Sequence, residues 1–146
     1  IHTCSADIIL GTETWLSSNI EDSELTLSDC FSIYRKDRYG SRGGGVMIAV
    51  RNCIPSSFIP VDSALEILWV TIGMGFQRCL LGVCYRPPDS RADFIDNLTE
   101  TVDNVQSKFP NMPIFLAGDF NYPGIDWATN EVLRNCPNKS ECLKFF

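Results

Sequence analysis

The sequence predicts a mixed α/β or α+β sandwich, in which two β-sheets pack together and are covered by helices. The first observation is a series of short apolar runs, rich in β-branched residues and closed by turn residues, which is typical of buried strands. The second is one long amphipathic stretch with helical spacing between two of these runs. The third is the length of 146 residues with 45% hydrophobic content, which fits one globular domain.

Strands dominate the first two thirds of the chain. Six apolar runs with strand-like composition follow one another, at 6–11, 31–35, 46–50, 57–61, 65–72 and 78–85. The last run is followed by Arg86-Pro87-Pro88, and prolines cannot continue a central ladder because they lack a backbone N–H. A polar, acidic segment at 17–29 and a glycine-rich segment at 40–45 separate the first runs, and we expect both to be loops.

The clearest helix is expected from about 90 to 109, with Ser90 in an N-capping arrangement. Residues at helical spacing form its apolar face, namely Phe94, Leu98, Val102, Val105 and Phe109. Pro110 ends this helix because proline does not fit a helix interior. Further along the chain we expect a turn at 122–125 and a last helix near 140–146.

Acidic and amide side chains follow the ends of two predicted strands. Glu13 follows the first strand, and a later strand at 112–117 ends in Gly118-Asp119-Phe120-Asn121. Mg²⁺ is often held by one or two carboxylates, several waters and a substrate phosphate. Strand-like alternation places Asp119 and Asn121 on one side of an extended segment. The alternative is that Glu13 caps a turn and that Asp and Asn are ordinary turn residues here.

Composition excludes several function classes. The 12 Lys and Arg against 18 Asp and Glu give a net charge of -6, which argues against a broad cationic surface that holds nucleic acid by counterion release alone. The one histidine, His2, precedes the first strand, which excludes a histidine-based catalytic centre in the interior. No apolar run approaches the roughly 18 residues of a membrane span, and no signal peptide is visible. We therefore expect a soluble intracellular protein without membrane association.

The cysteines and the chain ends lead to two further expectations. The seven cysteines contain no C-x-x-C pair, and several lie in apolar strand-like runs. We expect reduced core thiols and no disulfide framework. The chain has no initiator Met, begins shortly before the first strand and stops within an apolar-polar pattern, so we expect a domain cut at both ends.

Three blocks resemble the endonuclease/exonuclease/phosphatase superfamily, which includes deoxyribonuclease-I-like and apurinic/apyrimidinic endonucleases. They stand in the family's order as DIILGTETW at 7–15, GVCYRPP at 82–88 and FLAGDFN at 115–121. The sequence motifs within and around these blocks resemble the endonuclease domain of LINE-type, non-long-terminal-repeat retrotransposons. These motifs are Glu-Thr-Trp-Leu, Tyr-Arg-Pro-Pro and Gly-Asp-Phe-Asn-Tyr-Pro-Gly-Ile-Asp-Trp. The chain at 1–146 would be a partial domain of this kind, with a recognisable core at about 7–127.

The resemblance implies a four-layer α/β sandwich of two mixed β-sheets flanked by helices, incomplete here at both termini. It implies hydrolysis of phosphodiester bonds with Mg²⁺, or alternatively Mn²⁺, to nick target DNA and free a 3′-hydroxyl that primes a neighbouring reverse transcriptase. DNA and a reverse transcriptase domain of the parent polyprotein are the implied partners, and the nucleus is the implied location. Two alternatives stay open, a phosphomonoesterase or inositol or lipid phosphatase of the same superfamily, and a non-catalytic degenerate remnant.

Matching positions carry the family's roles onto four residues. Glu13 would hold the Mg²⁺, and Asp119 would position or activate the attacking water. Asn121 would hydrogen-bond a phosphate oxygen. Tyr85 would donate to the phosphate as negative charge builds in the transition state.

The sequence departs from the family pattern at both ends. The family has an asparagine on a strand before the glutamate block, and the residues before Ile8 contain none. It also has an aspartate and an Asp-His pair beyond the Gly-Asp-x-Asn block, and His2 cannot replace that histidine by motif. Because losing one member of a cooperating catalytic set costs factors on the order of 10⁴, we expect the isolated chain to be a weak or inactive nuclease.

Other charged and aromatic residues are weighed between structural and functional roles. Arg35, Arg38 and Arg42 belong to the basic cluster of the chain and could contact a DNA backbone, or they could lie on a solvated loop. We expect Trp69 to be a core residue of its strand. Glu66 is expected to be a charge at a strand edge rather than a ligand.

Overall fold

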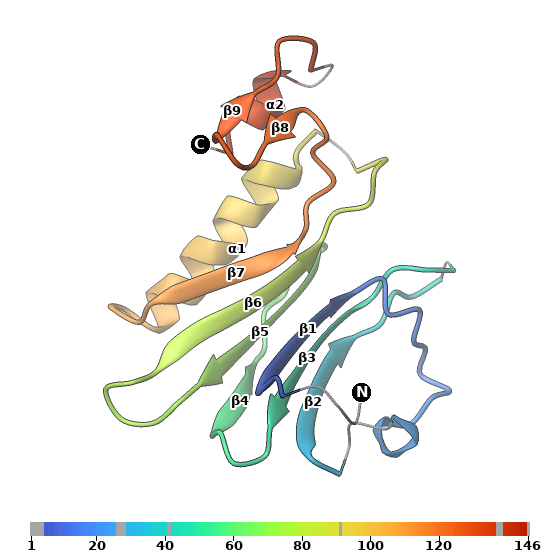
Figure 1. Ribbon diagram of the computed structural model, residues 1–146, viewed down its shortest axis with the longest axis vertical. Helices are drawn as coiled ribbons and strands as arrows, with labels where there is room; N and C mark the ends of the chain where they lie inside the picture. The colour runs from blue at the N-terminus through green and yellow to red at the C-terminus, as the bar shows by residue number, and fades with distance from the viewer. Residues whose placement is uncertain (1–4, 26–28, 41, 91, 137–138, 146) are drawn as a thin grey trace.

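The computed structural model describes residues 5–25, 29–40, 42–90, 92–136 and 139–145. Its strands form two larger sheets and a short hairpin (Figure 1). The first sheet is antiparallel with the order β1-β3-β2, and its strands are β1 (Ile8–Thr12), β2 (Phe31–Lys36) and β3 (Val46–Arg51). The second has the order β4-β5-β6-β7, and its strands are β4 (Ser56–Ile59), β5 (Glu66–Ile72), β6 (Cys79–Tyr85) and β7 (Ile114–Asp119).

The second sheet is mixed because its last two strands are connected by a helix. Strands β4, β5 and β6 pair antiparallel, whereas β6 and β7 are parallel. Parallel neighbours need a crossover connection, which α1 (Phe94–Lys108) supplies. In Figure 1, α1 runs alongside β7, so this helix covers one face of the second sheet.

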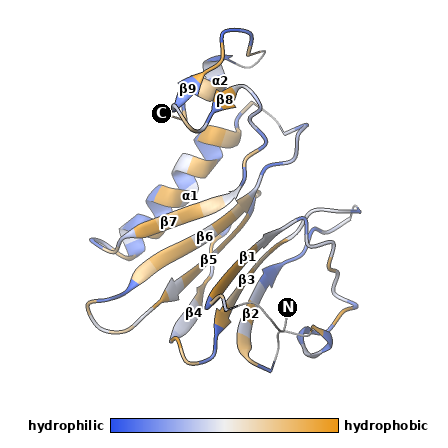
Figure 2. Cartoon of the chain, viewed as in Figure 1, coloured by the Kyte–Doolittle hydropathy of each residue, from blue (hydrophilic) through white to orange (hydrophobic). Residues whose placement is uncertain are grey.

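Aliphatic side chains from both sheets, together with one tyrosine, fill the space between them. The buried members of this core come from β3, β5 and β6, and they are Val46, Ile48, Val50, Leu68, Val70, Leu81, Val83 and Tyr85. Figure 2 shows hydrophobic colouring along most of β5 and β6, as expected for strands covered on both faces. Each fully buried aliphatic side chain of this size contributes about 1.5–3 kcal/mol.

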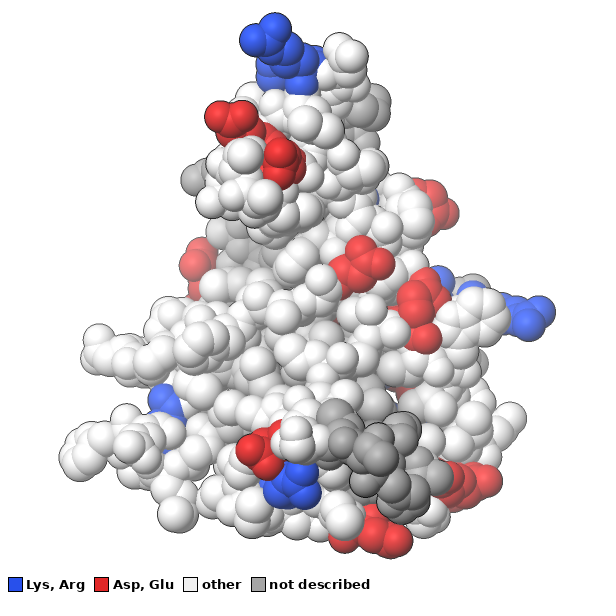
Figure 3. Space-filling model, in the orientation of Figure 1, with Lys and Arg blue, Asp and Glu red and all other residues white. Residues whose placement is uncertain are grey.

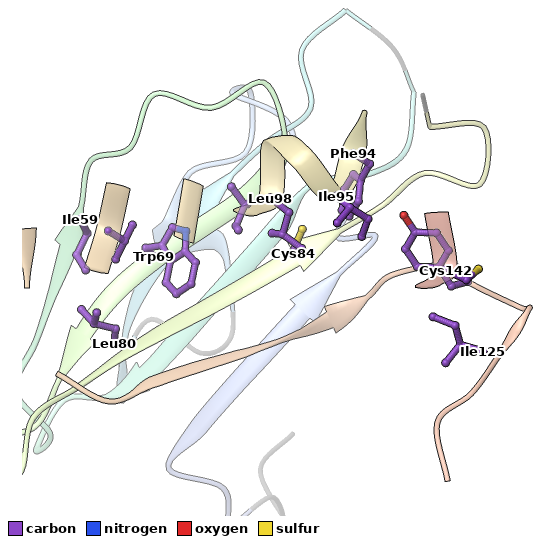
Figure 4. Packing of buried hydrophobic residues seen from close by; sticks show 12 residues of the cluster. Ile59, Trp69, Leu80, Cys84, Phe94, Ile95, Leu98, Ile125 and Cys142 are labelled. Atoms are coloured by element: carbon purple, nitrogen blue, oxygen red, sulfur yellow. The ribbon is translucent and has the colours of Figure 1, made fainter. Parts of the chain in front are cut away.

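A second core lies between the mixed sheet and α1 (Figure 4). Trp69 on β5 is 1% exposed, which confirms the expected core position. It lies opposite Gly82 of β6, where a β-carbon would come within 2.6 Å of the Trp69 ring. Leu98 and Val105 of α1 belong to the same cluster. Gly82 therefore gives the indole the space it needs beneath the helix.

Smaller elements complete the chain. A 3-10 helix, η1 (Asp22–Glu24), lies in the connection between β1 and β2. A two-stranded hairpin of β8 (Ile125–Asp126) and β9 (Glu131–Val132) precedes α2 (Lys139–Leu143). Figure 1 shows β8, β9 and α2 together at the upper end of α1. We call these three elements the C-terminal unit. No helix in the described ranges is long and apolar enough to cross a membrane.

The predicted fold class is confirmed, with corrections in detail. Only the four-stranded sheet is mixed, whereas two mixed sheets were expected. Ser90 is not the N-cap, because α1 begins at Phe94 with Asp93 in the N-cap position. Both described α-helices pack in the cluster on the α1 side, so the described residues supply three of the four expected layers.

The cysteines differ from the expected uniform core set. Cys84 is buried, and burial raises the pKa of its thiol to about 12. Cys30 and Cys53 are instead exposed, because both lie in turns next to strand ends. Cys136 and Cys142 are free thiols whose sulfur atoms lie 3.3 Å apart in the C-terminal unit. His2 lies outside the described residues.

Candidate active site

Strand register places three polar side chains in a row across the mixed sheet. Glu66 at the start of β5 lies opposite Tyr85 at the end of β6. Tyr85 in turn lies opposite Asp119 at the end of β7. Neighbouring strands are about 4.8 Å apart, so the three positions form one continuous row. This row lies at the end of the sheet where the parallel strands β6 and β7 finish.

Glu13 reaches this row from the other sheet. It directly follows β1, and its left-handed backbone, with φ of 52°, turns the chain away from the strand. Its Oε2 accepts hydrogen bonds from the Trp15 indole N–H at 2.6 Å and from the Gly44 N–H at 3.1 Å. The Tyr85 hydroxyl also bonds this carboxylate, and these hydrogen bonds hold the pKa of Glu13 below its ordinary value of 4.5. Glu13 is therefore ionised at neutral pH.

Tyr85 is a hydrogen-bond donor with a buried ring. The ring is 5% exposed and packs between the two sheets, while its hydroxyl reaches Glu13. The bond to Glu13, with burial, raises the pKa of Tyr85 to about 12. The hydroxyl consequently keeps its proton near neutral pH and remains able to donate.

The glycine-rich connection between β2 and β3 holds both carboxylates. Gly44 donates its N–H to Glu13, and Gly45 donates its N–H to Glu66 Oε2 at 2.6 Å. Arg38 binds Glu66 through Nε at 2.8 Å and lies over the Tyr85 ring, 5.6 Å from its centroid. A β-carbon on Gly44, which has a φ of 70°, would lie 2.4 Å from the Arg38 guanidinium. We call this β2–β3 connection, with Gly44, Gly45 and Arg38, the carboxylate-binding loop.

Asp119 and Asn121 occupy a tight turn. Strand β7 ends at Asp119, and Asn121 is left-handed with a φ of 48°, so the expected extended segment is wrong for Asn121. The Asp119 Oδ1 accepts the Asn121 N–H at 3.0 Å. This short bond bends the chain and leaves the Asp119 side chain exposed beyond the sheet.

Arg86 fixes this turn from beneath, a role that sequence reasoning missed. Its guanidinium donates to the Asn121 carbonyl at 3.1 Å, and its own carbonyl accepts the Asn121 side-chain amide at 2.7 Å. Arg86 is 3% exposed and stacks 4.2 Å above the Tyr122 ring. Glu141 of α2 lies 3.7 Å from it and accepts the Tyr122 hydroxyl at 2.7 Å. We call Arg86, Tyr122 and Glu141 the buried arginine cluster.

The expectation for Glu66 is refined. Glu66 does stand at a strand edge, but it also belongs to the site because it holds Arg38 against Tyr85. The signal that could have found it is its register position opposite Tyr85, which requires the strand pairing.

The three arginines considered for DNA contact have different surroundings. Arg35 is engaged with the Ile20 carbonyl, Asp22 and Asp37, and Arg38 is engaged with Glu66. Arg42 is exposed, and its guanidinium lies 5.2 Å from the centroid of the Trp15 ring. On the face shown in Figure 3, the Lys and Arg of the described chain are scattered among Asp and Glu.

The sequence matches the Endonuclease/Exonuclease/phosphatase family over residues 1–135. The chain therefore belongs to this family, whose members include nucleases and phosphatases. No curated protein sequence matches the chain.

Solved structures share the fold at low sequence identity. The endonuclease domain of TRAS1, a telomere-specific non-LTR retrotransposon, matches with a TM-score of 0.59 and 18% identity over 84% of this chain and 50% of that one. A truncated TDP2 from Caenorhabditis elegans matches with a TM-score of 0.50 and 14% identity over 88% of this chain and 53% of that one. The chain thus spans about half the length of these two structures.

The family resemblance implies a divalent metal, and the carboxylates of this site can be compared with the ligands that such an ion needs. The described residues contain no group of three or more His, Cys, Asp or Glu that could enclose an ion. They do present Glu13, an exposed and ionised carboxylate, and the exposed Asp119 carboxylate. This arrangement suits Mg²⁺ held by one or two carboxylates, waters and a substrate phosphate. It does not suit an ion enclosed by protein ligands alone.

Proposed function

We propose that this chain provides the core of a metal-dependent phosphodiesterase site that acts on DNA. The observation that supports it best is the contact between Glu13 and Tyr85, which joins the two sheets at the row containing Asp119. A carboxylate for a cation, a protonated phenol and a second exposed carboxylate then converge on one place. Those are the groups that phosphoryl chemistry needs for charge neutralisation, donation to a phosphate oxygen and water activation.

Each residue has a distinct task in this proposal. Glu13 holds the cation, which supplies Lewis acidity toward a phosphate oxygen when it is bound. The protonated hydroxyl of Tyr85 donates a hydrogen bond to a phosphate oxygen. The substrate then replaces Glu13 as the acceptor of this hydrogen bond. Asp119 accepts a proton from the attacking water. Asn121, fixed by Arg86, orients the phosphate through the second N–H of its side-chain amide.

The finer part of the proposal concerns the biological reaction. The TRAS1 domain belongs to a retrotransposon, and its fold is shared by this chain. We propose that the parent protein uses Mg²⁺ to nick nuclear target DNA, so that the freed 3′-hydroxyl primes a reverse transcriptase domain. The resemblance of the three sequence blocks to LINE-type endonuclease motifs supports this proposed nicking reaction.

Metal binding tests the Glu13 role without requiring turnover. Because the Trp15 indole N–H donates to Glu13, Mn²⁺ at this carboxylate should quench Trp15 fluorescence, and Mg²⁺ should compete. Glu13→Gln should remove the saturable response. Glu100→Gln, an equivalent change at an exposed carboxylate on α1, should leave it unchanged. Equal responses from both variants would contradict the assignment.

Nicking of supercoiled plasmid tests the reaction, since a single break is detectable even at a low rate. Asp119→Asn should lower Mg²⁺-dependent nicking by about 10²–10⁴-fold, the range for a lost general base. Asp103→Asn, an exposed carboxylate on α1, should not lower it. Hydrolysis of p-nitrophenyl phosphate without plasmid nicking would favour the phosphatase alternative instead.

A further inference from the structure

Trp15 is an exposed aromatic residue in a strained backbone conformation beside Glu13. Its φ is 56°, and 56% of its surface is exposed. A positive φ is strained for a bulky residue, and such outliers concentrate at functional sites. The exposed ring offsets little of this strain through burial. Packing therefore does not account for a tryptophan held in this way.

Several contacts nevertheless fix the position of the ring. The backbone N–H of Trp15 donates to the Gly44 carbonyl at 3.0 Å, and the indole N–H donates to Glu13 at 2.6 Å. A β-carbon on Gly43 would lie 3.6 Å from the ring, so this glycine packs closely beside it. These contacts orient the ring before any ligand arrives. A ligand that stacks on it need not offset the entropy of ordering the side chain.

Arg42 supplies a positive charge at the same place. Its guanidinium lies 5.2 Å from the centroid of the Trp15 ring, within the range of a cation–π contact. Arg35 and Arg38 are engaged with acidic partners, whereas the guanidinium of Arg42 contacts this aromatic ring. An aromatic surface next to a cation matches a nucleotide, whose base stacks while its phosphate pairs with the charge.

We propose that Trp15 and Arg42 form a stacking site for an unstacked nucleobase of the DNA substrate, adjacent to the scissile phosphate. This inference rests on DNA as the substrate in the proposed function. It places one base against the Trp15 ring and the neighbouring phosphate near Arg42. The hydrogen bond from Trp15 to Glu13 connects this base to the metal-binding carboxylate. The site accordingly favours single-stranded or frayed DNA over a fully stacked duplex.

The test compares two ligands that differ only in their bases. A labelled single-stranded oligonucleotide and its abasic analogue, with equal numbers of phosphates, are titrated by fluorescence anisotropy without divalent metal. The unmodified chain should bind the base-containing strand more tightly. Trp15→Ala should weaken that binding by about 5-fold to about 100-fold, the range for loss of one base–aromatic stack, and leave abasic binding unchanged.

Three further variants separate stacking from other effects. Phe76→Ala removes a fully exposed aromatic ring from the turn between β5 and β6, at the other end of β6 from Tyr85, and should change neither affinity. Trp15→Phe keeps a ring without the indole N–H and should retain most of the preference for bases. Arg42→Gln should weaken both ligands and reduce the salt dependence of binding, since Arg42 is assigned to a phosphate.

The outcomes separate this inference from the proposed function. Equal loss for both ligands in Trp15→Ala, no preference for bases in the unmodified chain, or no binding of either ligand would overturn the stacking site. Plasmid nicking with unaltered base preference in Trp15→Ala would overturn it while leaving the phosphodiesterase proposal intact. A base preference that depends on Trp15, in a chain whose plasmid nicking is not lowered by Asp119→Asn, would support the stacking site and contradict the catalytic role proposed for Asp119.

Discussion

The two halves of the candidate site are held in opposite ways. Glu13 lies on the exposed side, where neutral N–H groups from the glycine-rich loop and from Trp15 hold its carboxylate. Asn121 lies on the other side, where the Arg86 guanidinium donates to its carbonyl and the Arg86 carbonyl accepts its side-chain amide. The first half depends on backbone conformations that glycine adopts easily, and the second depends on a charge removed from water. Substitutions should therefore damage them through different mechanisms.

The largest effect is expected when the buried arginine cluster is broken. Arg86→Met leaves Glu141 buried without its cation, and removing one partner of a buried pair costs about 3–5 kcal/mol. Urea unfolding followed by circular dichroism measures this change in the free energy of unfolding. Arg78→Met, at an exposed arginine in the turn before β6, should stay within about 0.5 kcal/mol. Similar values for the two variants would show that the cluster does not stabilise the fold.

An intermediate effect is expected in the carboxylate-binding loop. Gly44→Ala combines a φ of 70° with a clash against Arg38, so it should cost about 2–3 kcal/mol and release the guanidinium from Glu66. Gly40→Ala has a similar φ of 78° but no atom within 4 Å of the new β-carbon, so it should cost about 1 kcal/mol. Thermal unfolding of the Gly44→Ala and Gly40→Ala variants measures the two losses of stability. Equal losses would mean that strain alone matters and that the Arg38 contact contributes nothing.

The smallest effect is expected from the titration of Glu13. Its folded pKa lies below 4.5, so its contribution to stability is fully present above the unfolded value and is lost as the pH falls through the folded one. Trp15 fluorescence should change in this acid range, because protonation removes the acceptor charge from the indole N–H. Glu13→Gln should lack the transition. A transition at or above 4.5 in the unmodified chain would contradict the lowered pKa.

Local patterns predicted the strand ends, and therefore most of the site. Glu13 and Asp119 follow or end an apolar run, so alternation and turn residues were enough to locate them, whereas Tyr85 was assigned through the family resemblance. Asn121 was placed at the correct strand end but with the wrong backbone conformation, because the bond from its N–H to Asp119 replaces the extended geometry. The start of α1 was missed by a few residues, since the helix begins at Phe94 and not near Ser90.

Interactions between distant segments could not be predicted in this way. Glu66 enters the site through its register with Tyr85, and Arg86 through burial against Tyr122 and α2. Neither residue stands out in the sequence, since a strand-edge glutamate and an arginine before prolines have ordinary exposed interpretations. Their roles depend on which strands pair and which face a helix covers.

The sequence alone determined the fold class, the family resemblance and the strand ends that carry carboxylates, since these depend on periodicity and short motifs. The tertiary structure alone decided that Tyr85 bonds Glu13, that Gly44 and Gly45 of the β2–β3 connection donate to two carboxylates, and that Trp15 stands exposed beside Arg42. The physical reason is range. Alternation is set by neighbouring residues, whereas hydrogen bonds and pKa shifts depend on groups that only the packing of two sheets brings within a few ångströms.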